Sequence, residues 1–93
     1  MIKSFRDPET RKIFERRYSL RFPKEIQETA NRKMIMIDST KVLDTLKSPP
    51  GNRLEKLTGN RKDQYSIRIN DKYRICFEWD DGDAYYVEIV DYH

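Results

Sequence analysis

The second half of the chain alternates apolar and polar residues, which is the pattern of half-buried β-strands. In QYSIRIN, residues 64–70, every second residue is apolar, and YRICFEW, residues 73–79, has the same period of two. A third run, AYYVEIVDYH, occupies residues 84–93. The stretches ND and DDGD, which separate the runs, are typical of turns. The pattern therefore predicts an antiparallel meander of three strands.

The same period assigns a face to each strand residue. If the apolar residues of the first two runs face the helices, then Arg68, Arg74 and Glu78 point outward, onto a surface that the helices leave uncovered. In the final run, the two expected sides are Tyr85, Val87 and Ile89 against Tyr86, Glu88, Val90 and Tyr92.

The first half of the chain predicts helices instead. DPETRKIFERR, residues 7–17, has Asp7 as a good N-cap and Pro8 in the first helical turn. A second helix begins at Pro23, and its apolar residues recur at helical spacing to form a stripe: Ile26, Ala30, Met34 and Ile37. Its opposite face carries Lys24, Glu28, Asn31 and Arg32. The stripe indicates a helix packed on the core.

Shorter features complete the expected fold. DSTKVLDTLK, residues 38–47, predicts a third short helix, capped by Asp38 or Ser39 and burying Val42, Leu43 and Leu46. MIKSF at the start of the chain predicts a short edge strand. The paired prolines and glycine of SPPGNR end the helical half. Residues 1–93 are therefore expected to form a single α+β domain, with N-terminal helices packed on one face of a small antiparallel sheet.

Composition favours a folded cytoplasmic protein. The chain has 93 residues, enough for one core and too few for two. Aromatic residues make up 12% of the chain, which favours folding over disorder even though 38% of the residues are charged. The lone Cys76 cannot form an internal disulfide, and no stretch has the character of a signal peptide or a membrane span. We expect a cytoplasmic location and no membrane partner.

Charge is unevenly distributed along the chain. Residues 47–74 hold 8 Lys and Arg against 3 Asp and Glu, whereas residues 75–93 hold none against 6. A concentrated basic segment is the electrostatic footprint of a polyphosphate partner, although an ordinary solvated surface has the same composition. The acidic end can pair with that segment or with basic groups on a second protein.

Several catalytic motifs are missing from the sequence. No Cys/His cluster suits zinc, and no glycine-rich phosphate loop follows a strand. WDDGD places Asp80, Asp81 and Asp83 around Gly82, but a stretch rich in Asp and Gly is far more often only a turn. We therefore expect neither a metal site nor a cofactor.

The remaining candidates suit RNA cleavage. Arg68 and Arg74 are expected on the outer face, with a positive rim from Arg53, Lys56, Arg61 and Lys62. Tyr92 can approach Arg74, and His93 supplies an imidazole that titrates near neutral pH. Together they would support attack of a ribose 2′-hydroxyl on its own phosphodiester, which needs a base, cationic donors for the phosphoryl oxygens and an acid, but no obligatory metal.

Two alternatives stay open on the residues alone. The first is that Arg68 and Arg74 bind no phosphate and are only solvated, or paired with Glu78 and Glu88. Tyr92 is a poor base at its ordinary pKa of about 10 unless a neighbouring arginine lowers it, so stacking on a nucleobase is an equally good role.

Three stretches of the chain resemble one known family. MIKSF at the start, PPGNRLEKLTGNRKDQYSIRINDKYRICFEW at residues 49–79 and GDAYYVEIVDYH at residues 82–93 resemble the HigB toxins, also called plasmid maintenance system killer proteins, of the RelE/ParE superfamily. The resemblance runs over essentially the whole chain. It is most specific at SIRINDKYRICF and VEIVDYH.

The resemblance implies a RelE/ParE-like fold and the toxin of a type II toxin–antitoxin pair, which enters the A site of the 70S ribosome and cuts translated mRNA. It implies a HigA-type helix-turn-helix antitoxin as partner, with operator DNA bound only through the antitoxin complex. By the match at YRICF, Arg74 is the expected phosphate-contacting arginine. By the match at DYH, Asp91, Tyr92 and His93 are the expected C-terminal active-site residues.

One segment departs from the family pattern. Many relatives carry a basic H-P-L-K-G type segment where this chain has EKLTG, so Glu55 stands in place of a histidine and Thr58 in place of a lysine. Either Lys56 and Arg61 take over phosphate binding, Glu55 serves as the general base, or the nuclease is weak. The departure leaves two other hypotheses open: a non-catalytic ParE-like inhibitor of DNA gyrase, and a basic RNA-binding module without toxicity.

Overall fold

The computed structural model describes residues 1–61 and 63–91. Within them the helices are α1 (Pro8–Phe14) and α2 (Lys24–Ser39), the 3-10 turns are η1 (Leu43–Lys47), η2 (Pro50–Asn52) and η3 (Gly59–Arg61), and the strands are β1 (Glu55–Lys56), β2 (Gln64–Arg68), β3 (Tyr73–Asp80) and β4 (Asp83–Asp91). The strands form one antiparallel sheet in the order β1-β2-β3-β4. Within the described residues the three predicted strands are confirmed, and β1 adds a short fourth.

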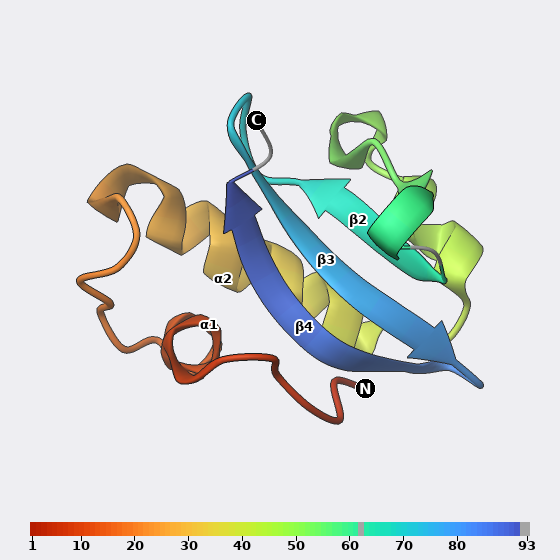
Figure 1. Cartoon of the computed structure of the whole chain (residues 1–93), viewed down its shortest axis with the longest axis horizontal. Coiled ribbons are helices and arrows are strands. Elements are labelled where there is room, and N and C mark those ends of the chain that lie inside the picture. Colours follow the sequence, from red (N-terminus) through yellow and green to blue (C-terminus); the bar gives the residue numbers. More distant parts are fainter. Residues whose placement is uncertain (62, 92–93) are drawn as a thin grey trace.

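One face of the sheet is covered by α2, which crosses behind it, while α1 lies beside β4 (Figure 1). The predicted apolar stripe of α2 is buried in full, and it packs with the inward residues of the sheet in one core: Ile26, Ala30, Met34, Ile37, Ile67, Ile75, Phe77 and Val87. The predicted α+β class, with helices on one face of an antiparallel sheet, is therefore confirmed. The face turned away from α2 is called the open face below.

The N-cap predicted for α1 is confirmed. Asp7 accepts a hydrogen bond from the backbone N–H of Thr10 at 2.7 Å, and the hydroxyl of Thr10 donates to the same carboxylate at 3.0 Å. That hydroxyl also accepts from the backbone N–H of Ile89 in β4 at 3.1 Å. The cap that starts α1 therefore also attaches the helix to the sheet.

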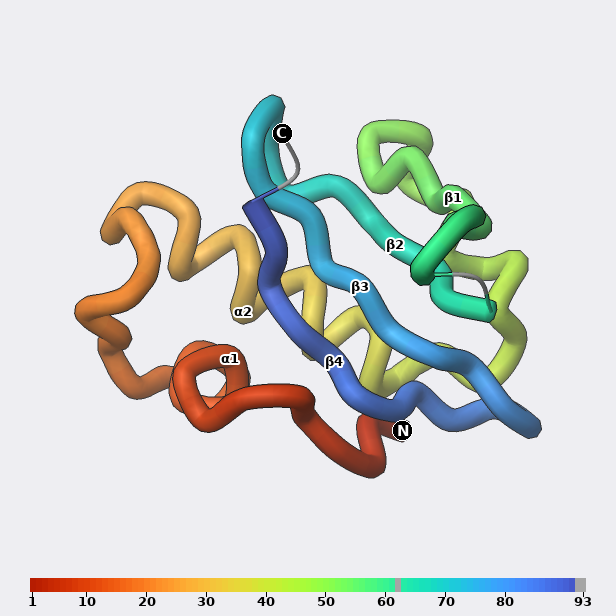
Figure 2. The backbone as a smooth tube through the Cα atoms, in the orientation of Figure 1, coloured from red at the N-terminus to blue at the C-terminus, as the bar shows by residue number. Residues whose placement is uncertain are grey.

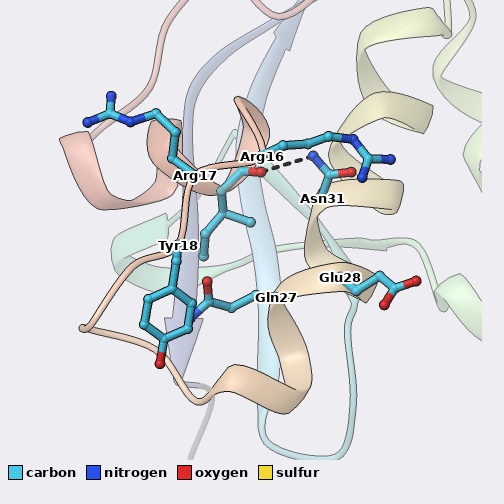
Figure 3. Close-up of a pocket in the computed structure, with 7 residues that line it drawn as sticks. Arg16, Arg17, Tyr18, Gln27, Glu28 and Asn31 are labelled. Atoms are coloured by element: carbon cyan, nitrogen blue, oxygen red, sulfur yellow. Dashed lines mark hydrogen bonds between the residues drawn. The ribbon is translucent and has the colours of Figure 1, made fainter.

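The end of α1 depends on a residue that the sequence placed on the exposed side of α2. Asn31 is only 6% exposed, so that assignment is wrong. Its side-chain amide donates to the carbonyls of Ile13 and Phe14 at 2.9 and 3.0 Å, which satisfies backbone groups at the end of α1. Figure 3 shows the Asn31 side chain pointing from α2 toward this end of α1. The helix ends at Phe14, before the predicted limit at residue 17, and Arg16 follows with a positive φ of 61°.

The third short helix predicted over residues 38–47 forms only in part, as the 3-10 turn η1, and its predicted cap is wrong. The second helix continues through Ser39, and Asp38 accepts a hydrogen bond from the backbone N–H of Ile2 at 2.8 Å instead of capping a new helix. The residues that follow form only the 3-10 turn η1, which buries Leu46 and leaves Val42 63% exposed. The predicted edge strand at MIKSF is reduced to isolated parallel bridges from Ile2 and Phe5 to β4.

A β-bulge in β4 overturns one assignment of faces. The pairing of β3 with β4 shifts by one residue between Cys76 and Glu78. Beyond the shift Glu78 pairs with Tyr85, which places Tyr85 toward the open face, while Val87 remains fully buried in the core. The prediction that Tyr85 shares a side with Val87 and Ile89 is wrong, because one extra residue resets the period of two.

None of the helices in the described part of the chain combines the length and the apolar character needed to cross a lipid bilayer.

Candidate functional site

Arg74, the arginine expected to contact phosphate, is held from two sides on the open face. Its Nε donates to the Oγ of Ser66 on β2 at 2.8 Å, and its Nη2 donates to the carbonyl of Arg53 at 2.6 Å. A longer bond of 3.4 Å runs from Nη2 to the carbonyl of Ser66. Charge-assisted bonds to two different elements fix the plane of the guanidinium.

Arg74 is not the exposed residue that strand alternation predicted. Only 7% of it is exposed, because the segment that contains β1 lies against the open face beside β2 (Figure 2). Alternation along β3 identifies the face of Arg74 correctly. The segment from Arg53 to Lys56 then covers Arg74 on that face. Arg53 makes this possible with a left-handed conformation, φ 45° and ψ 57°, that turns its carbonyl toward Arg74.

A small cleft of about 260 Å³ opens beside Arg74. It is lined by Arg53, Glu55, Arg68, Asn70, Asp71 and Arg74. The carboxylate of Glu55 lies 3.8 Å from Nη2 of Arg74, and its side chain is 52% exposed. The cleft thus combines guanidinium groups, which suit a phosphate, with an accessible carboxylate, which can accept a proton.

Positive charge is concentrated around this cleft. Arg68 forms an ion pair with Asp71, and its backbone carbonyl accepts a hydrogen bond from Nζ of Lys33 at 2.6 Å. Burial lowers the pKa of Lys33, and the cations Arg32, Arg68 and Arg74 lower this pKa further. Lys33 therefore lies among three arginines, in a region where an additional anion would be favourable.

The other sequence candidates on the described chain do not line the cleft beside Arg74. Lys56 stands opposite Tyr65, on the alternate side of β1 from Glu55. Asp91 stands opposite Tyr73 at the end of β4 and forms an ion pair of 3.6 Å with Lys72. The structure therefore brings Arg53, Glu55, Arg68 and Arg74 together and places Lys56 and Asp91 elsewhere. Lys62, Tyr92 and His93 lie outside the described residues.

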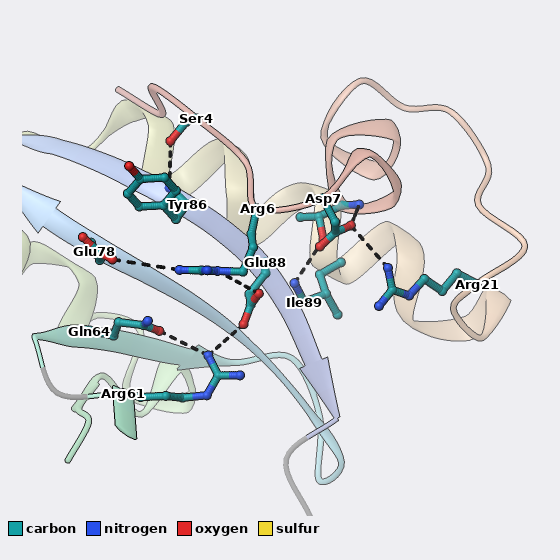
Figure 4. A network of polar contacts seen from close by, with 11 residues as sticks. Ser4, Arg6, Asp7, Arg21, Arg61, Gln64, Glu78, Tyr86, Glu88 and Ile89 are labelled. Carbon is teal, nitrogen blue, oxygen red and sulfur yellow. Dashed lines mark hydrogen bonds and ion pairs between the residues drawn. The ribbon is translucent and has the colours of Figure 1, made fainter. Parts of the chain in front are cut away.

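Arg61 belongs to a second polar group on the open face (Figure 4). Its Nη1 lies 2.7 Å from Oε1 of Glu88, while Nε of Arg6 lies 3.1 Å from the other oxygen of the same carboxylate. Arg6 also lies 3.9 Å from Glu78. The alternative that Glu78 and Glu88 pair with the two strand arginines is therefore wrong, since Arg6 and Arg61 take both carboxylates.

Two of these residues escaped the sequence analysis for different reasons. Ser66 alternates in register with Arg68, so its outward face was readable, but a serine in a strand carries no signal of holding an arginine. Arg6 lies before the first helix, and only the pairing of the N-terminal segment with β4 brings it over the sheet.

Cys76 lies on the open-face side of β3 but is fully buried. Burial raises the pKa of its thiol to about 11. Because the thiolate is the nucleophile, this cysteine is a packing residue. Within residues 1–61 and 63–91, no group of three or more His, Cys, Asp or Glu side chains is arranged to hold a metal ion.

The fold places the chain in a class of small α+β proteins with helices on one face of a four-stranded antiparallel sheet. Solved structures of YoeB from Staphylococcus aureus share the fold: the YoeB-YefM complex has a TM-score of 0.57 at 18% identity over 100% of this chain and 98% of that one. The YoeB dimer has a TM-score of 0.54 at 20% identity over 99% of this chain and 94% of that one.

The sequence then gives the family. The profile of HigB, the RelE-like toxin of a type II toxin–antitoxin system, matches residues 3–93, so the chain belongs to the HigB-like toxins. It is 38% identical over 86 residues, 90% of either chain, to Toxin HigB-1 of Vibrio cholerae. It is 30% identical over the full length of both chains to Endoribonuclease HigB of Proteus vulgaris. The suspected family is confirmed.

Proposed function

We propose that this toxin is an endoribonuclease that cuts mRNA on the translating ribosome. The main observation in support is the geometry of Arg74. Its guanidinium is fixed by Ser66 and by the Arg53 carbonyl, and it lies at the edge of a cleft that Glu55 also lines. The name of the Proteus vulgaris relative, an endoribonuclease, supports the same activity.

The proposed reaction is transesterification within the RNA. The 2′-oxygen forms a bond to phosphorus, the bond from phosphorus to the 5′-oxygen breaks, and the products are a 2′,3′-cyclic phosphate and a 5′-hydroxyl. One group removes the proton of the 2′-hydroxyl, and another returns a proton to the departing 5′-oxygen. Arg74, with Arg53 and Arg68 beside it, stabilises the charge that develops on the phosphoryl oxygens.

Glu55 is the base we propose among the described residues. Its carboxylate is half exposed and lies 3.8 Å from Arg74, so a phosphate held by Arg74 would place the neighbouring ribose within its reach. Many relatives carry a positive charge at this position. The carboxylate of Glu55 supplies a proton acceptor there instead. Asp91, Tyr92 and His93 remain proposed C-terminal participants, with Tyr92 stacking on a base and His93 transferring a proton.

The remaining parts of the proposal concern partners. We propose the A site of the 70S ribosome as the place of cutting, and a HigA-type helix-turn-helix antitoxin that neutralises the toxin and alone brings it to operator DNA. Solved YoeB neighbours include a complex with YefM, which supports an antitoxin partner for this fold. A cytoplasmic location follows from a ribosomal substrate.

Primer extension on translating ribosomes tests the proposal. Purified wild-type toxin should produce new mRNA ends, while Glu55→Gln and Arg74→Gln should reduce their yield by about 100-fold, the size typical of losing a general base or a charge-stabilising donor. Arg17→Gln, which removes an exposed arginine far from the cleft in sequence, is the matched control and should cut normally. Circular dichroism should confirm that each variant is folded.

Intact mRNA at a wild-type dose that stops growth would overturn the proposal. If pure toxin then inhibited DNA supercoiling by gyrase, the ParE-like alternative would take its place. Growth without any toxicity would favour a basic RNA-binding module.

A further inference from the structure

The β-bulge of β4 presents an aromatic side chain at the open face. Tyr86 is the bulged residue, with a positive φ of 53° and 49% of the residue exposed. A tyrosine rarely adopts this conformation, and such residues persist where surrounding contacts hold them. Here the N-terminal segment does so: the backbone N–H of Tyr86 donates to Ser4 Oγ at 2.9 Å, and Val87 N–H donates to the Ser4 carbonyl at 3.1 Å.

Arg6 completes an aromatic–guanidinium unit with Tyr86. Its Cζ lies 5.3 Å from the centroid of the Tyr86 ring, and Glu88 and Glu78 hold the guanidinium at 3.1 and 3.9 Å (Figure 4). A cleft of about 560 Å³ borders Tyr86, Tyr85 and Glu78. Bulges next to functional sites commonly re-aim a side chain, and this one re-aims a ring beside a cleft.

The charge of this group differs from that of the Arg74 cleft. Arg6 and Arg61 face Glu78 and Glu88, so these four charges cancel. The cleft beside Tyr86 adds Lys56 against Asp63 and Asp80, so it carries no excess of positive charge. A neutral group with an exposed ring, a planar guanidinium and carboxylate acceptors does not suit a phosphate. It suits a nucleobase, which is neutral and planar, stacks on tyrosine and arginine, and donates from its amino groups to carboxylates.

We propose that Tyr86 and Arg6 form a nucleobase-stacking subsite for a nucleotide that flanks the cleaved one. The inference rests on the proposed RNA-cleaving function. Arg74 and Glu78 lie on the same face of β3 four residues apart, roughly 13 Å at about 3.3 Å per residue. An RNA strand with its scissile phosphate at Arg74 therefore has room to place a neighbouring base at Tyr86.

Binding of an uncleavable RNA tests the subsite apart from the chemistry. The probe is a fluorescent single-stranded RNA whose 2′-hydroxyls are methylated, so that no 2′-oxygen can attack. We expect Tyr86→Leu to weaken its binding by roughly 5- to 100-fold, the effect of losing one stacked base. Tyr86→Phe should bind like the wild type, since stacking does not need the hydroxyl. Tyr18→Leu, which removes another exposed tyrosine, is the matched control.

The outcomes separate the subsite from the proposed function. Equal binding by Tyr86→Leu and Tyr18→Leu, or no binding of the probe by a wild type that cuts mRNA, would overturn the subsite and leave the nuclease standing. A Tyr86→Leu variant that binds the probe normally but loses antitoxin would make the ring a protein contact and also overturn it. A wild type that cuts no mRNA would overturn the proposed function, whatever the probe does. Thermal melting should verify that the variants are folded.

Discussion

The Nε of Arg74 lies 2.8 Å from the Oγ of Ser66, and both residues are nearly inaccessible to solvent on the open face of the sheet. The serine is on β2 and the arginine on β3, so the bond fixes the guanidinium relative to the sheet itself. Ser66 is therefore a positioning residue in the proposed site: it need not touch RNA, yet it sets the direction from which Arg74 meets a phosphate.

Ser66→Ala should lower the rate of RNA cleavage by about 10-fold, because a misplaced charge-stabilising donor loses part of its effect. The loss should fall mainly on kcat, since Arg53 and Arg68 still attract RNA. Single-turnover cleavage on mRNA-loaded ribosomes measures it. Ser39→Ala removes a hydroxyl from the exposed end of α2 and is the control. Equal rates for both variants would show that Ser66 does not position Arg74.

Arg74→Ala should also destabilise the protein, by about 1–3 kcal/mol, because the buried Oγ of Ser66 and the partly buried carbonyl of Arg53 lose their donor. Sequence alternation alone had implied a harmless surface change. Urea denaturation measures the free energy of unfolding. Arg17→Ala, on an exposed arginine, should stay within about 0.5 kcal/mol of the wild type. A similarly small change in Arg74→Ala would contradict the structural role.

Asn31→Leu should lower the free energy of unfolding by about 1–3 kcal/mol. The leucine cannot donate to the Ile13 and Phe14 carbonyls, so the end of α1 loses its partner from α2. Thermal and urea unfolding measure the change. Arg32→Leu, at the exposed neighbouring position, is the comparison, and a cost as large there would point to helix surface chemistry instead of the lost bonds.

Burial of Cys76 makes the free energy of unfolding depend on pH in the alkaline range. Its pKa rises from an ordinary value of 9.0 to about 11 in the folded protein, first because the thiol is buried. A pKa raised by folding contributes stability that is fully present below pH 9 and is lost as the pH rises toward 11. The free energy of unfolding should therefore fall more steeply over this range in the wild type than in Cys76→Ala. Urea denaturation at a series of pH values measures both slopes, and parallel slopes would contradict the assignment.

Where sequence and structure disagree, each disagreement has a long-range cause. Asn31 has the spacing of an exposed residue of α2, but the end of α1 lies against it and needs its donor. Tyr85 has the parity of a core residue, but the bulge shifts the register so that Tyr85 pairs with Glu78 and lies toward the open face. Asp38 has the chemistry of a helix cap, but Ile2 uses its carboxylate.

Sequence by itself determined the local periods and the charges. The period of two in residues 64–79 specified the strands and their faces, the stripe from Ile26 to Ile37 specified the buried side of α2, and Asp7 specified the start of α1. Only the tertiary structure decided that Arg74 lies beneath Arg53, and that Arg6 reaches Tyr86. The periodicity of a sequence reflects the average burial along a helix or strand. The covering of Arg74 and the bulge at Tyr86 depend instead on contacts between segments that are distant in the sequence.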